Sequence, residues 1–175
     1  MKSRKITYAA VCAALGVVAV LVSSYTPAKI VPLLFYSASA YISLIYVKWW
    51  GLLSVAVSLS LSFLTAGGFT GSFFLALTVF TPYALFALLM RKIGYASPVR
   101  CVIRGAAAVA FFTAVSLLLV LSSGLIVGTT FASVIERGGS WVLFLLMGII
   151  AVPTDFFFTF AVEKALALLK TRTGG

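Results

Sequence analysis

Six long apolar runs, separated by short segments, constrain this chain more than any other feature of its sequence. Proline, glycine and charged residues divide the 175 residues into runs at roughly 6–23, 30–47, 50–65, 72–90, 102–127 and 141–162. A hydrocarbon core about 30 Å thick needs about 20 apolar residues per crossing helix. The runs are continuous, whereas a membrane β-barrel needs short segments of alternating polarity. The sequence therefore predicts an all-α, polytopic membrane bundle of six transmembrane helices, in one domain over residues 1–175.

Composition favours a membrane environment over water. Hydrophobic residues make up 63% of the chain and charged residues 9%, whereas soluble domains average about 25% charged residues. Mean hydropathy is +1.20. An excess of 13 Lys and Arg over 3 acidic residues would indicate nucleic-acid binding in a soluble protein, but here these residues stand between apolar runs. We therefore expect a lipid bilayer, and no nucleic acid, as the partner of this basic chain.

The distribution of basic residues predicts the orientation of the helices. If the N-terminus lies in the cytoplasm, only Lys29 and Arg137 fall in outer loops. The other eleven basic residues then fall on the cytoplasmic side: Lys2, Arg4, Lys5, Lys48, Arg91, Lys92, Arg100, Arg104, Lys164, Lys170 and Arg172. Eleven against two is a strong positive-inside bias. We predict a multi-pass protein of the cell membrane with both termini in the cytoplasm.

Several residue types that carry catalysis or bind cofactors are missing. The chain has no histidine, no Gly-Lys-Ser/Thr phosphate loop and no pair of carboxylates within one short segment. Its two cysteines, Cys12 and Cys101, belong to no CxxC or Cys/His cluster that would hold a metal. A lone aspartate with serines could still act within a membrane, but the prediction is a protein that is not an enzyme and has no cofactor.

Small residues form a stripe along the first run. Ala9, Ala13 and Gly16 follow each other at helical spacing, so one helix face is nearly free of side chains and another helix can approach closely. Packing within the chain and docking of a separate protein are both open explanations. The fifth run has a similar stripe at Ala106, Ala110 and Ala114, for which packing within the chain is favoured.

Ser54, Ser58 and Ser62 line one face of the third run, with Thr65 close to the same face. Their hydroxyl groups need partners in a medium without water. Hydrogen bonds between helices are the favoured explanation, and a polar wall of a ligand cavity is the alternative.

Asp155 is the acidic residue predicted to lie deepest in the bilayer. Counted from Trp141 at about 1.5 Å per residue, it lies roughly 21 Å into the membrane, where an unpaired carboxylate costs several kcal/mol. It must be paired, protonated or exposed to an aqueous cavity, and Arg104 and Arg91 are the candidate partners. A structural ion pair and a functional role both remain open. Glu136 and Glu163 are predicted near the membrane surfaces, where water can solvate them.

The chain resembles a known family, the S components, which are the membrane-embedded substrate-binding subunits of energy-coupling factor vitamin transporters. The resemblance rests on the length, the six runs, the basic N-terminus and the segment Thr7-Tyr8-Ala9-Ala10-Val11-Cys12-Ala13-Ala14-Leu15, which is similar to the alanine motif of that family's first helix. Pro153-Thr154-Asp155, followed by Glu163-Lys164-Ala165-Leu166, also looks similar.

The resemblance implies a function and a set of partners. It implies capture of a vitamin-like small molecule from outside, contact of Ala9 and Ala13 with a transmembrane coupling subunit, and two ATPase subunits that supply energy. It also implies a ligand held beneath the outer loops. With the intramembrane Asp155, the candidate substrate-binding residues are then Tyr25, Lys29, Gly68, Arg137 and Trp141, which offer aromatic faces, cations and close backbone approach.

A noncatalytic scaffold of a cell-shape or division complex is the competing hypothesis. Small six-span subunits of this kind are also basic, compact and free of catalytic motifs. An S component predicts a ligand-sized cavity, whereas a scaffold predicts a bundle filled by its own side chains.

Overall fold

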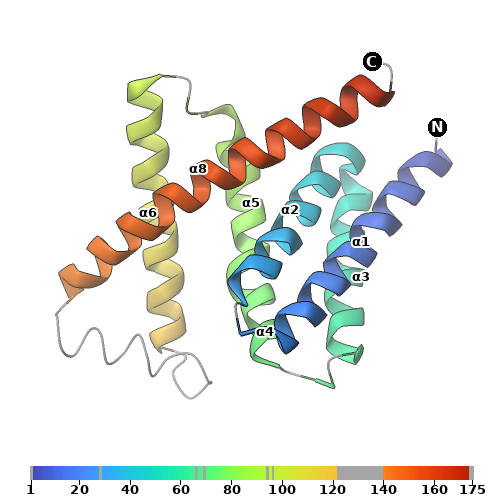
Figure 1. Cartoon of the computed structure of the whole chain (residues 1–175), viewed down its shortest axis with the longest axis horizontal. Helices are drawn as coiled ribbons and strands as arrows, with labels where there is room; N and C mark the ends of the chain where they lie inside the picture. Colours follow the sequence, from blue (N-terminus) through green and yellow to red (C-terminus); the bar gives the residue numbers. More distant parts are fainter. Residues whose placement is uncertain are drawn as a thin grey trace. The chain divides into compact units, whose positions relative to one another are not determined.

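The chain is helical throughout the part that the structure describes. A computed structural model describes the backbone of residues 2–27, 29–65, 67–68, 70–93, 95, 97–121 and 140–173, and within these residues it contains no strand. The helices are α1 (Lys2–Tyr25), α2 (Ile30–Val47), α3 (Trp49–Thr65), α4 (Gly71–Leu75), the π-helix η1 (Ala76–Phe80), α5 (Thr81–Leu89), the 3-10 helix η2 (Met90–Lys92), α6 (Pro98–Leu121) and α8 (Ser140–Thr173). The predicted all-α fold is confirmed (Figure 1).

Among the described residues, four helical segments are long and apolar enough to cross a membrane: Lys5–Tyr25, Ile30–Val47, Gly71–Lys92 and Pro98–Leu118. A fifth, Trp49–Thr65, is apolar but shorter. Many large apolar side chains on these helices are exposed, among them Leu15, Phe35 and Val102. Such a surface is unfavourable in water and suits hydrocarbon. These features indicate a membrane protein, while the number of crossings and the side on which the termini lie stay predictions.

The helix boundaries follow the predicted runs closely. The second run and α2 coincide, and the third and fourth runs agree with the structure to within two residues. The fifth helix begins earlier than predicted, at Pro98, and the last one continues beyond the sixth run to Thr173. The predicted end of the fifth run, residues 122–127, lies outside the described residues.

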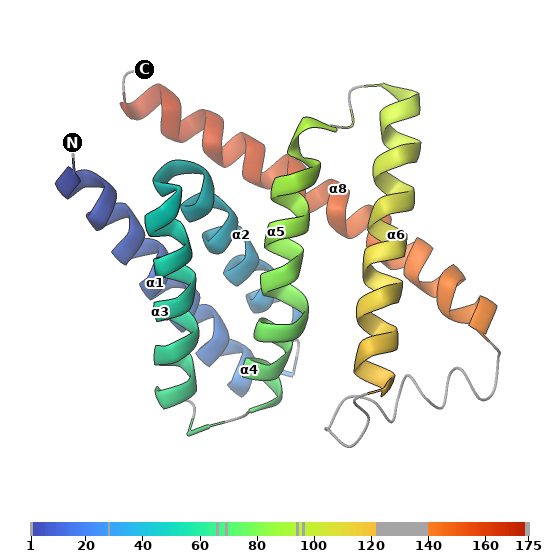
Figure 2. The same ribbon diagram turned by 180° about the vertical axis from the view of Figure 1, so that it is seen from behind.

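The chain divides into two units. The first comprises Met1–Leu88 together with Val162–Gly175, and the second comprises Leu89–Ala161. In the first unit, α1, α2 and α3 all pack against one another, and α4 packs against α1 (Figures 1 and 2). The second unit contains η2, α6 and the part of α8 that includes Pro153.

A tight turn at Lys48 separates α2 from α3. Lys48 has a positive φ of 52°, which is uncommon for a residue with a side chain. Just beyond it, a Cβ atom at Gly51 would lie 2.5 Å from the carbonyl oxygen of Ser43, so only glycine allows the two helices to come this close. The turn falls in the short interval between the second and third predicted runs, and Trp49 and Trp50 already belong to α3.

A π-helical segment interrupts the helix between Gly71 and Lys92. The backbone N–H of Thr81 donates to the carbonyl of Ala76, five residues earlier. Pro82 follows, and it has no backbone N–H for the bond that a regular helix would make at that position. Two side chains add hydrogen bonds here: Thr81 Oγ1 also donates to the Ala76 carbonyl, and Ser37 Oγ of α2 donates to the Phe80 carbonyl. The bond from Ser37 ties α2 to the helical segment between Gly71 and Lys92.

Candidate functional site

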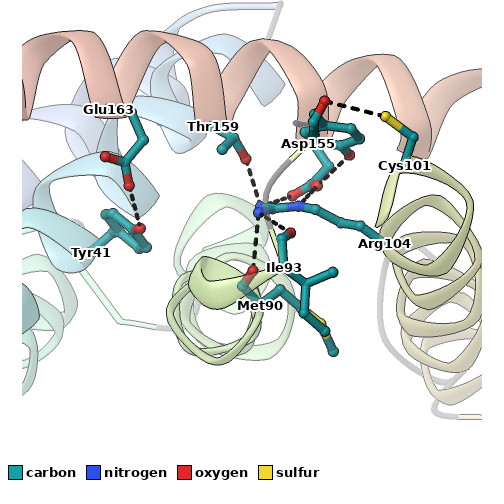
Figure 3. Close-up of polar contacts among 9 residues, drawn as sticks. Tyr41, Met90, Ile93, Cys101, Arg104, Asp155, Thr159 and Glu163 are labelled. Atoms are coloured by element: carbon teal, nitrogen blue, oxygen red, sulfur yellow. Dashed lines mark hydrogen bonds and ion pairs between the residues drawn. The ribbon is translucent and has the colours of Figure 1, made fainter. Parts of the chain in front are cut away.

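The second unit contains a buried ion pair. Arg104 on α6 places Nε 2.6 Å from Oδ2 of Asp155 on α8, and its Nη2 lies 3.3 Å from Oδ1 (Figure 3). The two side chains are 1% and 0% exposed. Of the three states predicted for Asp155, the structure shows the paired one, and Arg104 is a partner.

Every N–H group of the Arg104 guanidinium has an acceptor. Nη1 donates to the backbone carbonyls of Met90 and Ile93, each at 3.2 Å, and Nη2 also donates to Oγ1 of Thr159 at 2.6 Å. With the two bonds to Asp155, this accounts for all five donors of an arginine side chain. Figure 3 shows Arg104 reaching from α6 to Asp155 and Thr159 of α8 and to the carbonyls of Met90 and Ile93.

Tyr95, in the turn between η2 and α6, completes the cluster. Its hydroxyl donates to Asp155 Oδ2 at 2.6 Å, and Cζ of Arg104 lies 5.0 Å from the centroid of its ring. The ring meets Phe156 edge-on at 5.2 Å. Burial, followed by the neighbouring Asp155 carboxylate, raises the pKa of Tyr95, so the phenol stays protonated and acts as a donor. The Tyr95 carbonyl in turn accepts a hydrogen bond from Cys101 Sγ at 3.4 Å.

Sequence reasoning identified Arg104 and Asp155 but missed Tyr95 and Thr159. Thr159 lies one helical turn after Asp155 on the same face, so the spacing is a signal that could have found it. Tyr95 belongs to a turn without helical periodicity, and no pattern in the sequence marks it. The backbone carbonyls of Met90 and Ile93 have no sequence signal of any kind.

The other described acid, Glu163, is exposed. In the first unit, the buried Tyr41 of α2 donates its hydroxyl to Glu163 Oε1 at 3.4 Å (Figure 3). Glu136, the third acid, lies outside the described residues.

The structure describes three of the predicted outer-loop residues, all in the first unit. Tyr25 ends α1 and is 85% exposed. Lys29 precedes α2, and its Nζ would lie 3.9 Å from a Cβ atom at Gly71, the first residue of α4. Gly68 has a φ of +110°, and apart from its chain neighbours no described residue has an atom within 4 Å of where its Cβ would be. The α1–α2 and α3–α4 connections lie at the same end of the first unit (Figures 1 and 2).

Two predicted outer residues cannot be placed in a site. Arg137 lies outside the described residues, and Trp141 is described only by its backbone, in the first turn of α8. The structure therefore brings Lys29 next to the start of α4 and leaves the contribution of these two residues as a prediction.

A groove of about 450 Å³ lies between α1 and α2. Its lining is almost wholly apolar and includes Leu15, Val18, Val22, Val31, Phe35 and Ile42. Val22 and Val31 are at the end nearest the connection that contains Tyr25 and Lys29. A volume between about 300 and 1,000 Å³ is typical of sites for small molecules.

Ala9 and Ala13 pack inside the first unit. Their side chains are 9% and 6% exposed. The backbone carbonyls of the same two residues accept hydrogen bonds from Ser54 Oγ at 2.9 Å and Ser58 Oγ at 3.1 Å on α3. A Cβ atom at Gly16 would lie 2.7 Å from Ser58 Oγ. The stripe of small residues thus lets α3 approach α1, so a docking face on α1 has to present other residues.

The serine stripe of α3 forms the predicted hydrogen bonds between helices at two of its three positions, Ser54 and Ser58. The Oγ atom of Ser62 is also buried but has no hydrogen-bond partner among the described residues. The favoured explanation of the stripe is therefore confirmed for its first two members.

Comparison of the chain with protein-family models, with curated proteins and with solved structures yields no match.

Proposed function

We propose that the chain is the substrate-capture subunit of an energy-coupling factor transporter, which takes up a vitamin-like small molecule from outside the cell. The observation that carries the proposal is the groove of about 450 Å³ between α1 and α2. Its size is that of a small-molecule site, and one end of it adjoins the predicted outer connection between Tyr25 and Lys29. A scaffold subunit would need no such groove.

The surroundings of the groove favour a ligand with an apolar body and an anionic end. The walls offer apolar contact from Val22, Val31 and Phe35. Lys29 supplies a positive charge near Gly71, where a helical segment begins. Unpaired backbone N–H groups at a helix start also favour negative charge. A carboxylate or phosphate on the ligand would therefore meet two positive elements at this end.

The chain has no phosphate-binding loop, so the energy for uptake has to come from partner subunits. A transmembrane coupling subunit and two ATPase subunits fill that role in the proposal. The face of α1 available for docking carries the exposed small residues Ala10 and Ala14, one helical turn apart, because Ala9 and Ala13 pack on α3. Small residues at this spacing admit a closely packed partner helix.

Ligand binding is tested by thermal unfolding of the purified protein with a panel of vitamins, nucleobases and related metabolites. One compound should stabilise the chain, since a ligand at 100 times its Kd adds about 2.7 kcal/mol to the free energy of unfolding. Ala38→Trp should abolish this stabilisation, because Ala38 lines the groove and the larger ring fills it. Lys29→Ala should weaken it for an anionic compound.

Two matched variants serve as controls for this experiment. Ala56→Trp places the same ring on an exposed position of α3, and Lys92→Ala removes an exposed lysine at the end of η2. Both should bind like the parent protein. If no compound stabilises the chain, or if Ala38→Trp binds as well as Ala56→Trp, the groove is not the ligand site and the scaffold hypothesis takes precedence.

A further inference from the structure

The guanidinium of Arg104 has no donor left for a ligand. Its five N–H groups are taken up by Asp155, Thr159 and the carbonyls of Met90 and Ile93, all from the chain itself. These acceptors belong to the first residue of η2, to the turn after it and to α8, while Arg104 belongs to α6. One cation therefore holds together three segments besides its own helix.

Tyr95 is the member of the cluster that covers the charges. Its side chain is partly exposed, whereas Arg104 and Asp155 are buried. The ring lies against the guanidinium. The hydroxyl donates to Asp155 Oδ2, the same atom that accepts from Arg104 Nε. Displacement of this one residue would let water reach both charges.

We propose that Tyr95, Arg104 and Asp155 form a conformational latch that fixes Met90, Ile93 and Tyr95 on α6 and α8, with Tyr95 as the element that opens first. The physical reason is the dielectric environment. While Tyr95 excludes water, the attraction between the two charges is strong; once water enters, the same attraction weakens several-fold. Opening therefore removes the interaction that keeps these residues in place.

The latch assigns Asp155 a positioning role. Its Oδ2 accepts from Arg104 and Tyr95, and its Oδ1 accepts from Arg104, so the carboxylate is engaged by the chain itself. This inference does not rest on the proposed transport function. It concerns a different set of residues from the groove between α1 and α2, and its test needs neither a ligand nor a partner subunit.

Cys101 provides a native reporter for the latch. Its thiol donates to the Tyr95 carbonyl and is partly buried, so a change in the turn alters its exposure. In a Cys12→Ala background, Cys101 is the single cysteine of the chain. The rate at which a maleimide modifies it in purified protein then measures how often the turn opens.

The latch predicts a graded series of modification rates. Tyr95→Phe keeps the ring but loses the hydrogen bond to a carboxylate, and it should raise the rate about tenfold. Tyr95→Ala loses the ring as well and should raise the rate further. Asp155→Asn should also raise it in ligand-free protein. Tyr8→Phe, on an exposed residue of the first unit, should leave the rate unchanged.

Helix content measured by circular dichroism separates opening from unfolding. If Tyr95→Ala or Asp155→Asn loses helix content, Tyr95→Phe decides the question, because it retains the ring contacts. The latch is wrong if Cys101 in folded Tyr95→Phe and Tyr95→Ala reacts at the parent rate. It is also wrong if folded Asp155→Asn reacts at the parent rate without ligand, the result that a purely ligand-binding aspartate predicts.

Discussion

At the scale of single residues, Arg104 and Asp155 show how charge is accommodated within an apolar helical chain. Neither side chain has access to solvent, yet five hydrogen bonds surround the guanidinium and three reach the carboxylate. A buried ion pair often contributes little net stability compared with an apolar pair of similar size, because both ions lose their hydration. Removing only one partner is far more costly, since the other charge stays buried alone.

This difference gives a prediction for the ion pair. Arg104→Met or Asp155→Leu alone should lower the free energy of unfolding by about 3–5 kcal/mol. The double variant Arg104→Met/Asp155→Leu should recover a large part of this loss, because no unpaired charge remains. Denaturant or thermal unfolding of the purified protein in detergent measures all three. Additive effects of the two single changes would show that the side chains do not act as a pair.

At the scale of helices, the two faces of α1 have separate roles. Ala9 and Ala13 face α3, where Ser54 and Ser58 donate to their carbonyls. Ala14 lies next to Ala13 in the sequence but is exposed. The small residues predicted to share one face of α1 do so, and the helix that packs on this face is α3 of the same chain. Helical spacing shows that small residues share a face without showing which helix occupies it.

The neighbouring alanines allow a matched test of these roles. Ala13→Trp should lower the free energy of unfolding by about 1–3 kcal/mol, because the ring overpacks the α1–α3 contact. Ala14→Trp should change it by no more than about 0.5 kcal/mol. Thermal unfolding measures both effects. Ala14→Trp should also prevent co-purification with a coupling subunit while the chain stays folded, and an intact complex in this variant would exclude docking through that face.

At the scale of the whole molecule, the distribution of basic residues predicts which ends of the helices face the cytoplasm. Single cysteines introduced into a chain without Cys12 and Cys101 can be labelled with a reagent that does not cross the membrane. Cysteines at Lys2, Gly94 and Thr173 should react only after the membrane is opened. Cysteines at Tyr25 and Gly138 should react in intact cells. External labelling at Gly94 would overturn the predicted orientation.

Much of the fold could be predicted from the sequence because helix formation in a membrane is governed by local properties. Apolar runs of sufficient length form helices, since backbone groups in hydrocarbon have to bond within their own segment. The runs therefore anticipated α2 in full and placed the turn at Lys48. The predicted depth of Asp155 likewise indicated that its carboxylate needs a partner, a proton or water. The cost of an unpaired carboxylate in hydrocarbon does not depend on the details of packing.

The tertiary structure alone decided which residues meet. Arg104 and Asp155 are 51 positions apart, and Tyr95 and Asp155 are 60 apart, so no local pattern relates them. The choice of Arg104 for Asp155 depends on how α6 lies against α8, and the burial of Ala9 and Ala13 depends on how α3 lies against α1. Contacts between distant segments arise from the packing of whole helices, and a helix with apolar residues on several faces does not specify from its own sequence which face is covered.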